Sequence, residues 1–225
     1  MSPHKQAELS AIGYLSRYDR TMQLIGMLDS PFVRRVAITM RMLGIDYDHN
    51  PLSIFRTYDE FRKINPLVKV PTLVCDDGTV LVDSTLIISY LESIVGRSLM
   101  PEKLSEQRKA LQLIGVSLVA MEKVAQRIYE LKVRPEDYQY APWIERLNEQ
   151  LAAALDWMES AVSDVGANEW LFGARVTQAD ITISVAWRFI VYSAATEARL
   201  EDHPALVAYS ERAEKLPEFL ACPID

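Results

Sequence analysis

Cysteine, positive charge and long apolar runs are all scarce in this chain of 225 residues, and each scarcity excludes a class of protein. The two cysteines, Cys75 and Cys222, form no Cys-x-x-Cys pair and no Cys/His cluster, so we expect neither a disulfide framework nor a zinc site. No apolar run reaches membrane-spanning length, and the N-terminus lacks the apolar core of a secretory signal. These absences predict a protein of a reducing compartment, the cytoplasm, with no membrane partner.

Acidic residues outnumber basic ones, which gives a net charge of −7 and a pI of about 5.1. This balance argues against a surface that binds nucleic acid or an anionic membrane. The 49% hydrophobic and 24% charged content is typical of a soluble globular protein. At this length the chain can form one large domain or two small ones.

The first 98 residues alternate between strand and helix patterns. Residues 1–21 are polar and aperiodic, which predicts a flexible extension, with Met22 as a candidate start of the functional chain. Residues 22–28 form a short apolar run suited to a buried strand. Ser30 and Pro31 then open a helix that Gly44 ends. A second strand is expected within 45–53 and a short helix over 58–64.

The stretch Asn65–Glu92 predicts a hairpin followed by a helix. Strands are expected over 72–75 and 79–82, because an Asp-Asp-Gly turn joins two apolar runs. An amphipathic helix opens near Asp83 and Ser84 and stops before Gly96. The order βαβ followed by ββα predicts a mixed sheet covered by helices.

Strand signals disappear after residue 104. Long amphipathic segments over 105–133 and 142–165 predict helices. Thr177 and Asp180 have the spacing of a capping box, with Asp in place of the usual Glu, before an apolar helix that reaches about Ala195. The second half of the chain is therefore expected to be an all-helical bundle with this helix at its centre.

Two short motifs in the first half suggest chemistry. Pro71 cannot donate a ladder hydrogen bond; if the Val70–Pro71 bond is cis, Val70 would offer its N–H and C=O to an extended ligand. Asp83 and Ser84 place a carboxylate, a hydroxyl and free N–H groups at a helix start, where they could hold the ammonium and carboxylate of an amino acid. The alternative is an ordinary hairpin with a capped helix.

These motifs resemble the glutathione transferase family, in which Val-Pro and an acidic residue followed by Ser form most of the glutathione pocket. The capped, buried helix after Leu171-Phe172-Gly173 is a further point of resemblance. The resemblance implies a thioredoxin-like domain over 22–98, a linker over 99–104 and an all-helical domain over 105–225. The extension over 1–21 departs from family members, which commonly start their first strand near the initiator Met.

The resemblance also implies roles for individual residues. Ser30, in a Ser-Pro-Phe sequence similar to that of the serine-using classes such as the plant tau class, would stabilise the glutathione thiolate; alternatively it is only an N-cap. Lys69 would reach the glycyl carboxylate, and Arg56 is a weaker basic candidate in a loop where relatives place one. Phe32 would border the pocket of the second substrate. The glutathione-binding set is Lys69, Val70, Pro71, Asp83, Ser84 and Arg56.

The implied function is a glutathione transferase that conjugates the thiolate of reduced glutathione to an electrophilic, mostly apolar small molecule. Glutathione would be the co-substrate, with no metal or prosthetic group, and family members are usually homodimers. Two alternatives stay open: a glutathione-dependent isomerase or disulfide reductase on the same fold, and a non-catalytic glutathione-binding or interaction module. The scattered apolar positions do not identify the electrophile.

Overall fold

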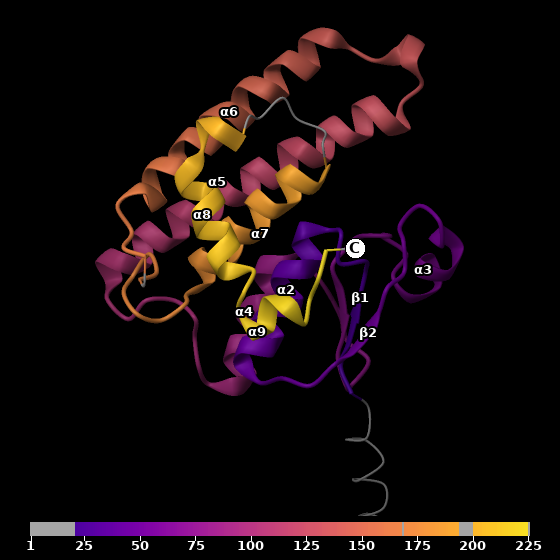
Figure 1. Cartoon of the computed structure of the whole chain (residues 1–225). Helices are drawn as coiled ribbons and strands as arrows, with labels where there is room; N and C mark the ends of the chain where they lie inside the picture. Colours follow the sequence, from indigo (N-terminus) through magenta and orange to yellow (C-terminus); the bar gives the residue numbers. More distant parts are fainter. Residues whose placement is uncertain (1–20, 168, 194–199, 225) are drawn as a thin grey trace, which may run out of the picture. The chain divides into compact units, whose positions relative to one another are not determined.

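The computed structural model describes residues 21–167, 169–193 and 200–224. The chain forms two compact units, Met1–Val95 and Gly96–Asp225 (Figure 1). The extension predicted over 1–21 lies outside the described residues, apart from Thr21.

A four-stranded mixed sheet forms the centre of the first unit. Its strands are β1 (Gln23–Ile25), β2 (Asp48–Asn50), β3 (Thr72–Val74) and β4 (Val80–Val82). They lie in the order β2-β1-β3-β4, with β1 parallel to β2 and antiparallel to β3, and with β3 antiparallel to β4. The second strand is shorter than the predicted span of 45–53.

Within residues 21–95 of this unit, three helices accompany the sheet. They are α2 (Pro31–Leu43), α3 (Tyr58–Ile64) and α4 (Ser84–Val95). As predicted, α2 has Ser30 at its N-cap and Pro31 at its first position, and it ends at Gly44 in the left-handed region (φ 73°). Helices α2 and α4 pack against each other and contribute apolar side chains to the core, together with the central strands. The fully buried members include Leu24, Ile25, Val36, Met40, Leu73, Ile87 and Leu91.

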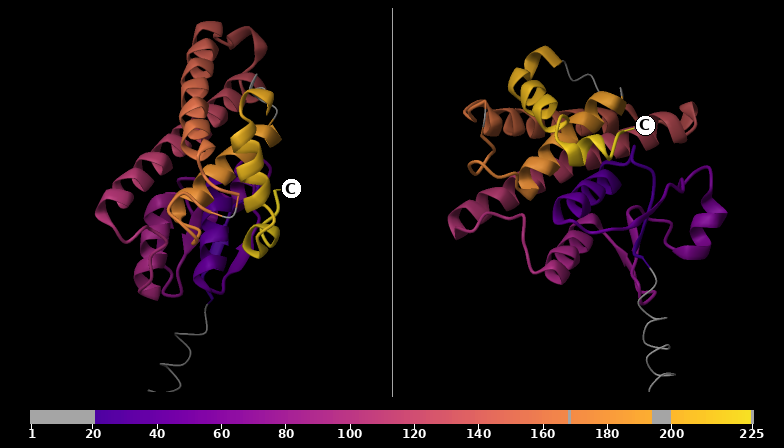
Figure 2. Two further views of the ribbon diagram at one scale, coloured as in Figure 1. Left: turned by 60° about the vertical axis from the view of Figure 1, so that its left-hand side comes forward. Right: turned by 60° about the horizontal axis from the view of Figure 1, so that its bottom comes forward.

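Helices alone make up the regular structure described in the second unit. Its long helices are α5 (Leu104–Ile128), α6 (Ala141–Ser163) and α7 (Gln178–Ser193), and its short ones are α8 (Pro204–Ala213) and α9 (Pro217–Leu220). Helix α5 packs on both α6 and α7, and the views in Figure 2 show α5 and α6 side by side. The segment predicted to continue as helix to residue 133 instead makes a π-helical turn, Tyr129–Val133, and a 3₁₀ turn follows at Glu136–Tyr138.

Helix α7 is the buried centre of this unit, as its apolar pattern predicts, because 13 of its 16 residues are buried. Its start is held by Asp180, whose Oδ2 accepts hydrogen bonds from both the N–H and the hydroxyl of Thr177 at 2.6 Å. Its Oδ1 accepts from the N–H of Leu171 at 2.9 Å and from the phenol of Tyr209. One of the two bonds of the predicted capping box is therefore present, the one from the N–H of Thr177 to the acidic side chain of Asp180.

The predicted fold class, a mixed α/β unit followed by an all-helical unit, is confirmed. A search of the described ranges for a helix with the length and apolar character needed to cross a membrane finds none.

Candidate functional site

The sheet register brings the three candidate segments to one end of the sheet. Ile25, the last residue of β1, pairs with Thr72, the first of β3, and Thr72 pairs with Val82, the last of β4. The connection to Ser30 therefore leaves the sheet at the same end where Val70–Pro71 enters it. The chain that leads from β4 into α4 also leaves at this end.

Ser30 lies at the head of α2, in the short connection that follows β1. Its backbone is extended (φ −73°, ψ 118°); its N–H donates to the carbonyl of Met27 at 3.2 Å, and its carbonyl accepts from the N–H of Arg34 at 2.9 Å. The hydroxyl makes no capping bond and has no hydrogen-bond partner in the described part of the chain. This half-buried hydroxyl is thus available to a ligand beside the free N–H groups of the first helical turn.

Gly26 allows the head of α2 and the segment before β3 to come into direct contact. Its φ is 133°, and a Cβ at this position would lie 2.6 Å from Val33 Cγ2 and 2.9 Å from Val70 Cγ1. Only glycine fits both the backbone conformation and the space. Its carbonyl oxygen also lies 2.8 Å from Nε2 of His49. Val70 is therefore held against the loop that leads to Ser30.

The Val70–Pro71 peptide bond is cis, and side chains hold the loop before it. Nδ2 of buried Asn65 donates to Thr72 Oγ1 at 2.8 Å, and the same hydroxyl donates to the carbonyl of Lys69 at 2.6 Å. Within residues that the structure describes, neither the N–H nor the C=O of Val70 has a hydrogen-bond partner. Both groups can pair with an extended ligand, as the sequence predicts for a cis bond.

Asp83 acts as the cap of α4, so the capping alternative holds for one of its two oxygens. Its backbone is in the left-handed region (φ 71°), and Oδ1 accepts from the N–H of Thr85 at 2.8 Å and of Leu86 at 3.3 Å. The exposed carboxylate keeps Oδ2 without a donor among the described residues. That oxygen can accept a hydrogen bond from an ammonium group.

Ser84, in contrast, faces the protein and is 2% exposed. Its hydroxyl oxygen accepts a hydrogen bond from Nη1 of Arg35 at 2.9 Å, and the same nitrogen lies 3.2 Å from Thr85 Oγ1. Arg35 belongs to α2 and is itself buried. Burial lowers the pKa of its guanidinium to about 10, although the nearby carboxylate of Asp83 favours the charged form. The guanidinium is therefore cationic at neutral pH.

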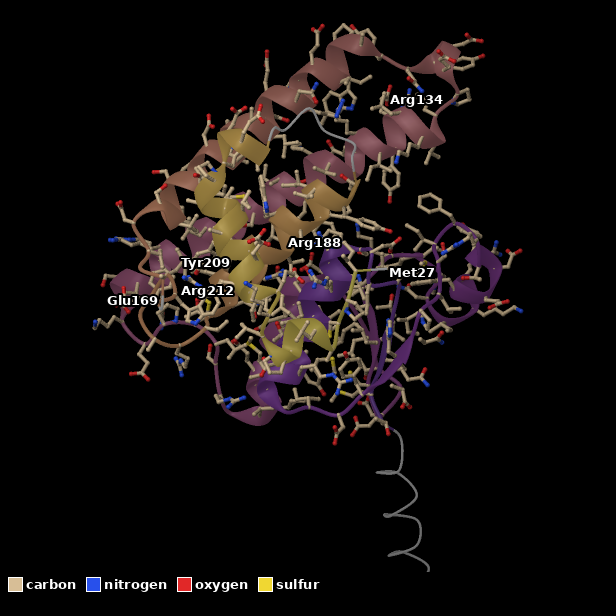
Figure 3. The ribbon with its side chains drawn as sticks, in the orientation of Figure 1. Met27, Arg134, Glu169, Arg188, Tyr209 and Arg212 are labelled. Carbon is tan, nitrogen blue, oxygen red and sulfur yellow. The ribbon has the colours of Figure 1, made fainter. Side chains whose placement is uncertain are left out.

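The two weaker basic candidates occupy different positions. Lys69 is exposed, and its ammonium group has no ion-pair or hydrogen-bond partner within the described ranges. Arg56 is also exposed, but its Nη2 lies 3.1 Å from the sulfur of Met27, which Figure 3 labels. Met27 belongs to the connection between β1 and Ser30. Arg56 thus reaches the same loop as Ser30. Phe32, the second residue of α2, is half-buried.

Cys75 follows β3 as a buried thiol. Burial raises the pKa of this thiol, with smaller contributions from the carboxylates of Asp77 and Asp76. Such a group is protonated at neutral pH and is a poor nucleophile. No set of three His, Cys, Asp or Glu side chains that could hold a metal ion occurs in the described ranges.

Three residues of this site were not singled out from the sequence: Gly26, Arg35 and Asn65. A signal exists for Arg35, because a charged residue stands among the apolar positions Val33 and Val36 of an amphipathic helix. Gly26 follows an apolar strand directly, which is a usual place for a close backbone approach. Neither signal indicates which partner the residue contacts.

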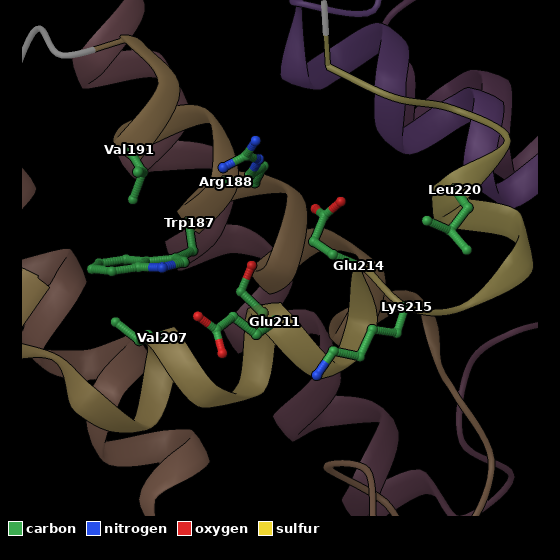
Figure 4. A pocket seen from close by; sticks show the side chains of 9 residues that line it. Trp187, Arg188, Val191, Val207, Glu211, Glu214, Lys215 and Leu220 are labelled. Atoms are coloured by element: carbon green, nitrogen blue, oxygen red, sulfur yellow. The ribbon is translucent and has the colours of Figure 1, made fainter.

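The helical unit has a pocket of its own, about 470 Å³ in volume, between α7 and α8. Figure 4 shows Trp187, Val191 and Val207 at one side, and the acidic Glu211 and Glu214 at the other. None of the residues predicted to bind a ligand belongs to its lining. The full lining is Trp187, Arg188, Val191, Val207, Ser210, Glu211, Glu214, Lys215 and Leu220.

Comparison with known proteins gives the same assignment for both halves of the chain. Residues 24–98 match the profile described as "Glutathione S-transferase, N-terminal domain", and residues 141–212 match "Glutathione S-transferase, C-terminal domain". Glutathione S-transferase 3 of Zea mays is 30% identical over 167 residues, which cover 71% of this chain and 73% of the maize protein. The chain therefore belongs to the glutathione S-transferase family.

Two further relatives bear on the subgroup and the fold. The probable maleylacetoacetate isomerase 1 of Drosophila melanogaster is 28% identical over 198 residues, which cover 83% of this chain and 75% of the fly protein. A glutathione S-transferase from Methylobacterium radiotolerans, solved in complex with glutathione sulfonate, superposes with a TM-score of 0.81. It is 23% identical, and the alignment covers 89% of this chain and 93% of that chain, which supports the shared fold.

Proposed function

We propose that this protein is a glutathione transferase that uses Ser30 to stabilise the thiolate of bound glutathione, in the manner of the serine-using classes. The observation that carries the proposal is the Ser30 hydroxyl, which stands at the head of α2 without a capping bond. A hydroxyl donor and a helix N-terminus both favour a negatively charged sulfur.

The other candidate residues have matching roles in this proposal. The N–H and C=O of Val70, beside Pro71, pair with the cysteinyl backbone of glutathione. Oδ2 of Asp83 accepts from the glutamyl ammonium group, and Ser84 donates to the neighbouring carboxylate. Lys69 pairs with the glycyl carboxylate, and Arg56 and Phe32 border the loop of Ser30.

In the transferase reaction the thiol proton leaves to solvent and the thiolate attacks an electrophilic carbon of the second substrate. A sulfur–carbon bond forms, and either a leaving group departs with its electron pair or the adduct takes up a proton. Ser30 lowers the free energy of the thiolate and does not itself take the proton.

We further propose that the protein is cytoplasmic and forms a homodimer, as is usual in the family. Light scattering on the purified chain tests whether it is a dimer.

Glutathione-dependent isomerisation is the second candidate, favoured by the name of the Drosophila relative. The same thiolate would add to a carbon–carbon double bond, the single bond so formed would rotate, and elimination would restore the thiolate. Both reactions need the activated sulfur, so the roles of the site residues are shared. Only the second substrate separates them.

The test is to assay Ser30→Ala for conjugation of a chlorinated nitrobenzene and for isomerisation of a cis enedione acid, beside Ser89→Ala as a control. Ser89 is an exposed serine of α4, and its hydroxyl has no hydrogen-bond partner among described residues. We expect Ser30→Ala to lower kcat about 100-fold, as the loss of one donor to a developing anion does. We expect the dissociation constant of glutathione to change less than twofold.

Full activity in Ser30→Ala would contradict the assigned role of Ser30. If the wild-type chain isomerises the enedione and conjugates nothing, the isomerase is the correct function. A chain that binds glutathione and catalyses neither reaction would contradict both proposals.

A further inference from the structure

The pocket between α7 and α8 is formed by one face of each helix. Its lining residues recur at helical spacing: on α7 they are Trp187, Arg188 and Val191, and on α8 they are Val207, Ser210, Glu211 and, at the C-cap, Glu214. Its volume of about 470 Å³ is within the range of pockets that hold small molecules. The pocket lies within the second unit and shares no residue with the proposed glutathione site. A ligand bound here is therefore distinct from glutathione.

The indole of Trp187 is buried in the wall of this pocket, yet its N–H has no acceptor. The residue is 4% exposed, and its ring packs against the imidazole of His203 with the ring centroids 5.7 Å apart. In the part of the chain that the structure describes, the indole N–H makes no hydrogen bond. The nitrogens that are both sealed from solvent and unpartnered do not include this one, so the N–H faces the open pocket. A buried indole N–H usually finds an acceptor, and here the place for one is inside the pocket.

The carboxylate of Glu211 is the matching acceptor group of the pocket. Figure 4 shows the nitrogen-bearing edge of the Trp187 ring turned toward Glu211. This carboxylate makes neither an ion pair nor a hydrogen bond with any described residue. An indole N–H can only donate, and an ionised carboxylate can only accept. The pocket thus offers a ligand one donor and one acceptor.

Apolar side chains accompany this donor and acceptor. Val191 and Val207 are half-buried, and Leu220 of α9 is 65% exposed at another edge of the pocket. A flat aromatic body that covers these side chains removes apolar surface from water, which is the main favourable term in binding to such a pocket.

The charged residues of the lining argue against a carboxylate or a phosphate as the ligand. Arg188 and Lys215 are exposed, so solvent and salt screen their positive charges. Glu211 and the half-buried Glu214 add two negative charges to the same lining. An anion that accepts from the indole N–H would be repelled by these carboxylates. A neutral ligand that also donates to Glu211 avoids this repulsion.

We propose that the pocket binds a flat heteroaromatic amine in which an amino group stands beside a ring nitrogen. The ring nitrogen accepts a hydrogen bond from the indole N–H of Trp187, and the amino group donates to the carboxylate of Glu211. The ring covers Val191, Val207 and Leu220. The second unit therefore carries a binding site for a further class of ligand, which is independent of the proposed transferase reaction.

The test uses three bicyclic compounds of similar size on the full chain at pH 8. 4-Aminoquinazoline has the amino group and the adjacent ring nitrogen, quinazoline has only ring nitrogens, and 1-aminonaphthalene has only the amino group. Binding is followed in ¹⁵N NMR spectra by the indole N–H signals, of which the signal of Trp187 is identified by its loss in Trp187→Phe. We expect 4-aminoquinazoline to shift this signal downfield, because a hydrogen bond deshields the proton. The indole signals of the other tryptophans should stay in place.

Each of the two incomplete compounds should bind about tenfold more weakly than 4-aminoquinazoline, the usual effect of one lost hydrogen bond of this kind. Glu211→Ala should weaken the binding of 4-aminoquinazoline about tenfold and that of quinazoline less than threefold, since quinazoline has no amino group to donate. The control with the same charge change is Glu149→Ala, an exposed glutamate of α6 outside the lining. It should bind all three compounds as the wild type does.

Two results would overturn the inference. One is a Trp187 signal that does not move at a saturating concentration of 4-aminoquinazoline, a measurement on the wild-type chain that does not depend on how a variant folds. The other is equal binding of the three compounds, or binding of 4-aminoquinazoline that Glu211→Ala leaves unchanged. Ser30→Ala should bind 4-aminoquinazoline as the wild type does, so the failure of this inference and the failure of the proposed function are separate results.

Discussion

At the scale of single residues, the site depends on backbone conformations that few amino acids adopt. Gly26 supplies a φ of 133° where Val33 and Val70 leave no room for a Cβ. Asp83 adopts a φ of 71°, which its short polar side chain tolerates and which directs its carboxylate onto the helix start. Val68 also has a positive φ, of 47°, although it is β-branched.

Val68 provides the first prediction at this scale, because a β-branched residue is strained in the left-handed region. Val68→Gly should raise the free energy of unfolding by about 1 kcal/mol, the net of relieved strain and the entropy of a freer unfolded chain. The measurement is the urea midpoint of the variant beside the wild type. A lower midpoint would show that the contacts of the half-buried valine outweigh its strain.

The residue scale is also where the sequence is least informative. Ser30, Val70, Asp83 and Ser84 could be named because their types and order resemble a known pocket. Whether Ser30 caps α2 or stays free is decided by a single hydrogen bond, which no pattern records. The contact between Arg35 and Ser84 joins residues 49 positions apart, so only the packing of α2 against α4 reveals it.

At the scale of elements, helix ends carry both stability and function. Helix α2 begins with a free serine hydroxyl, α4 with an aspartate cap that leaves donors on Ser84, and α7 with a fully occupied aspartate. The first two leave donors for a ligand at one end of the sheet. In the third, both carboxylate oxygens of Asp180 accept hydrogen bonds from within the protein, so Asp180 is structural.

Asp180 gives the second prediction, because it is 1% exposed and accepts four hydrogen bonds. Asp180→Ala leaves buried donors on Thr177 and Tyr209 without their acceptor, at about 1–3 kcal/mol each before relaxation. The N–H of Leu171 loses one of its two acceptors and keeps the phenol oxygen of Tyr209 at 3.2 Å. We expect a loss of about 3–5 kcal/mol in the free energy of unfolding, measured by denaturant titration. The control is Asp156→Ala on α6, whose side chain is 84% exposed and which should change stability by less than about 0.5 kcal/mol. A loss for Asp180→Ala no larger than that of the control would contradict the cap.

The third prediction concerns the pH dependence of this cluster, which Figure 3 shows around Tyr209, Arg212 and Glu169. Burial, and then the carboxylate of Asp180, raise the pKa of the Tyr209 phenol well above its ordinary value of 10.0. The folded phenol stays protonated where the unfolded one ionises, so its contribution to stability is complete below pH 10 and declines as the pH rises further.

Each pH unit above 10 should therefore lower the free energy of unfolding by about 1.4 kcal/mol through this group. Tyr209→Phe should lack that part of the slope, which denaturation curves between pH 8 and 11.5 can measure. Identical slopes in the two proteins would mean that the phenol ionises in the folded state.

The elements themselves were largely predictable. Sequence patterns predicted the elements α2, α3, β3, β4, α4 and α7 to within a few residues. These patterns were periodic apolar positions, Ser30-Pro31 at a helix start, the Asp-Asp-Gly turn and glycines at helix ends. Two departures have physical causes. The second strand pairs only over Asp48–Asn50, since Pro51 cannot donate to the sheet, and α5 changes to a π turn at Tyr129, which an apolar period does not reveal.

At the scale of the whole molecule, all the residues proposed to bind glutathione lie in the first unit, while the second unit carries a pocket of its own. The family assignment rests on both halves, because separate profiles match residues 24–98 and 141–212. The assignment does not choose between conjugation and isomerisation. Both reactions need an activated glutathione sulfur, which the site around Ser30 is proposed to supply.

The most direct test of this claim is a pH titration of the ultraviolet absorbance of the thiolate of glutathione bound to the wild-type protein. We predict a pKa at least one unit below the value of about 8.5 for an ordinary thiol. In Ser30→Ala the pKa of bound glutathione should return toward that value. A bound thiol that titrates like free glutathione, or a shift that Ser30→Ala leaves unchanged, would contradict the claim.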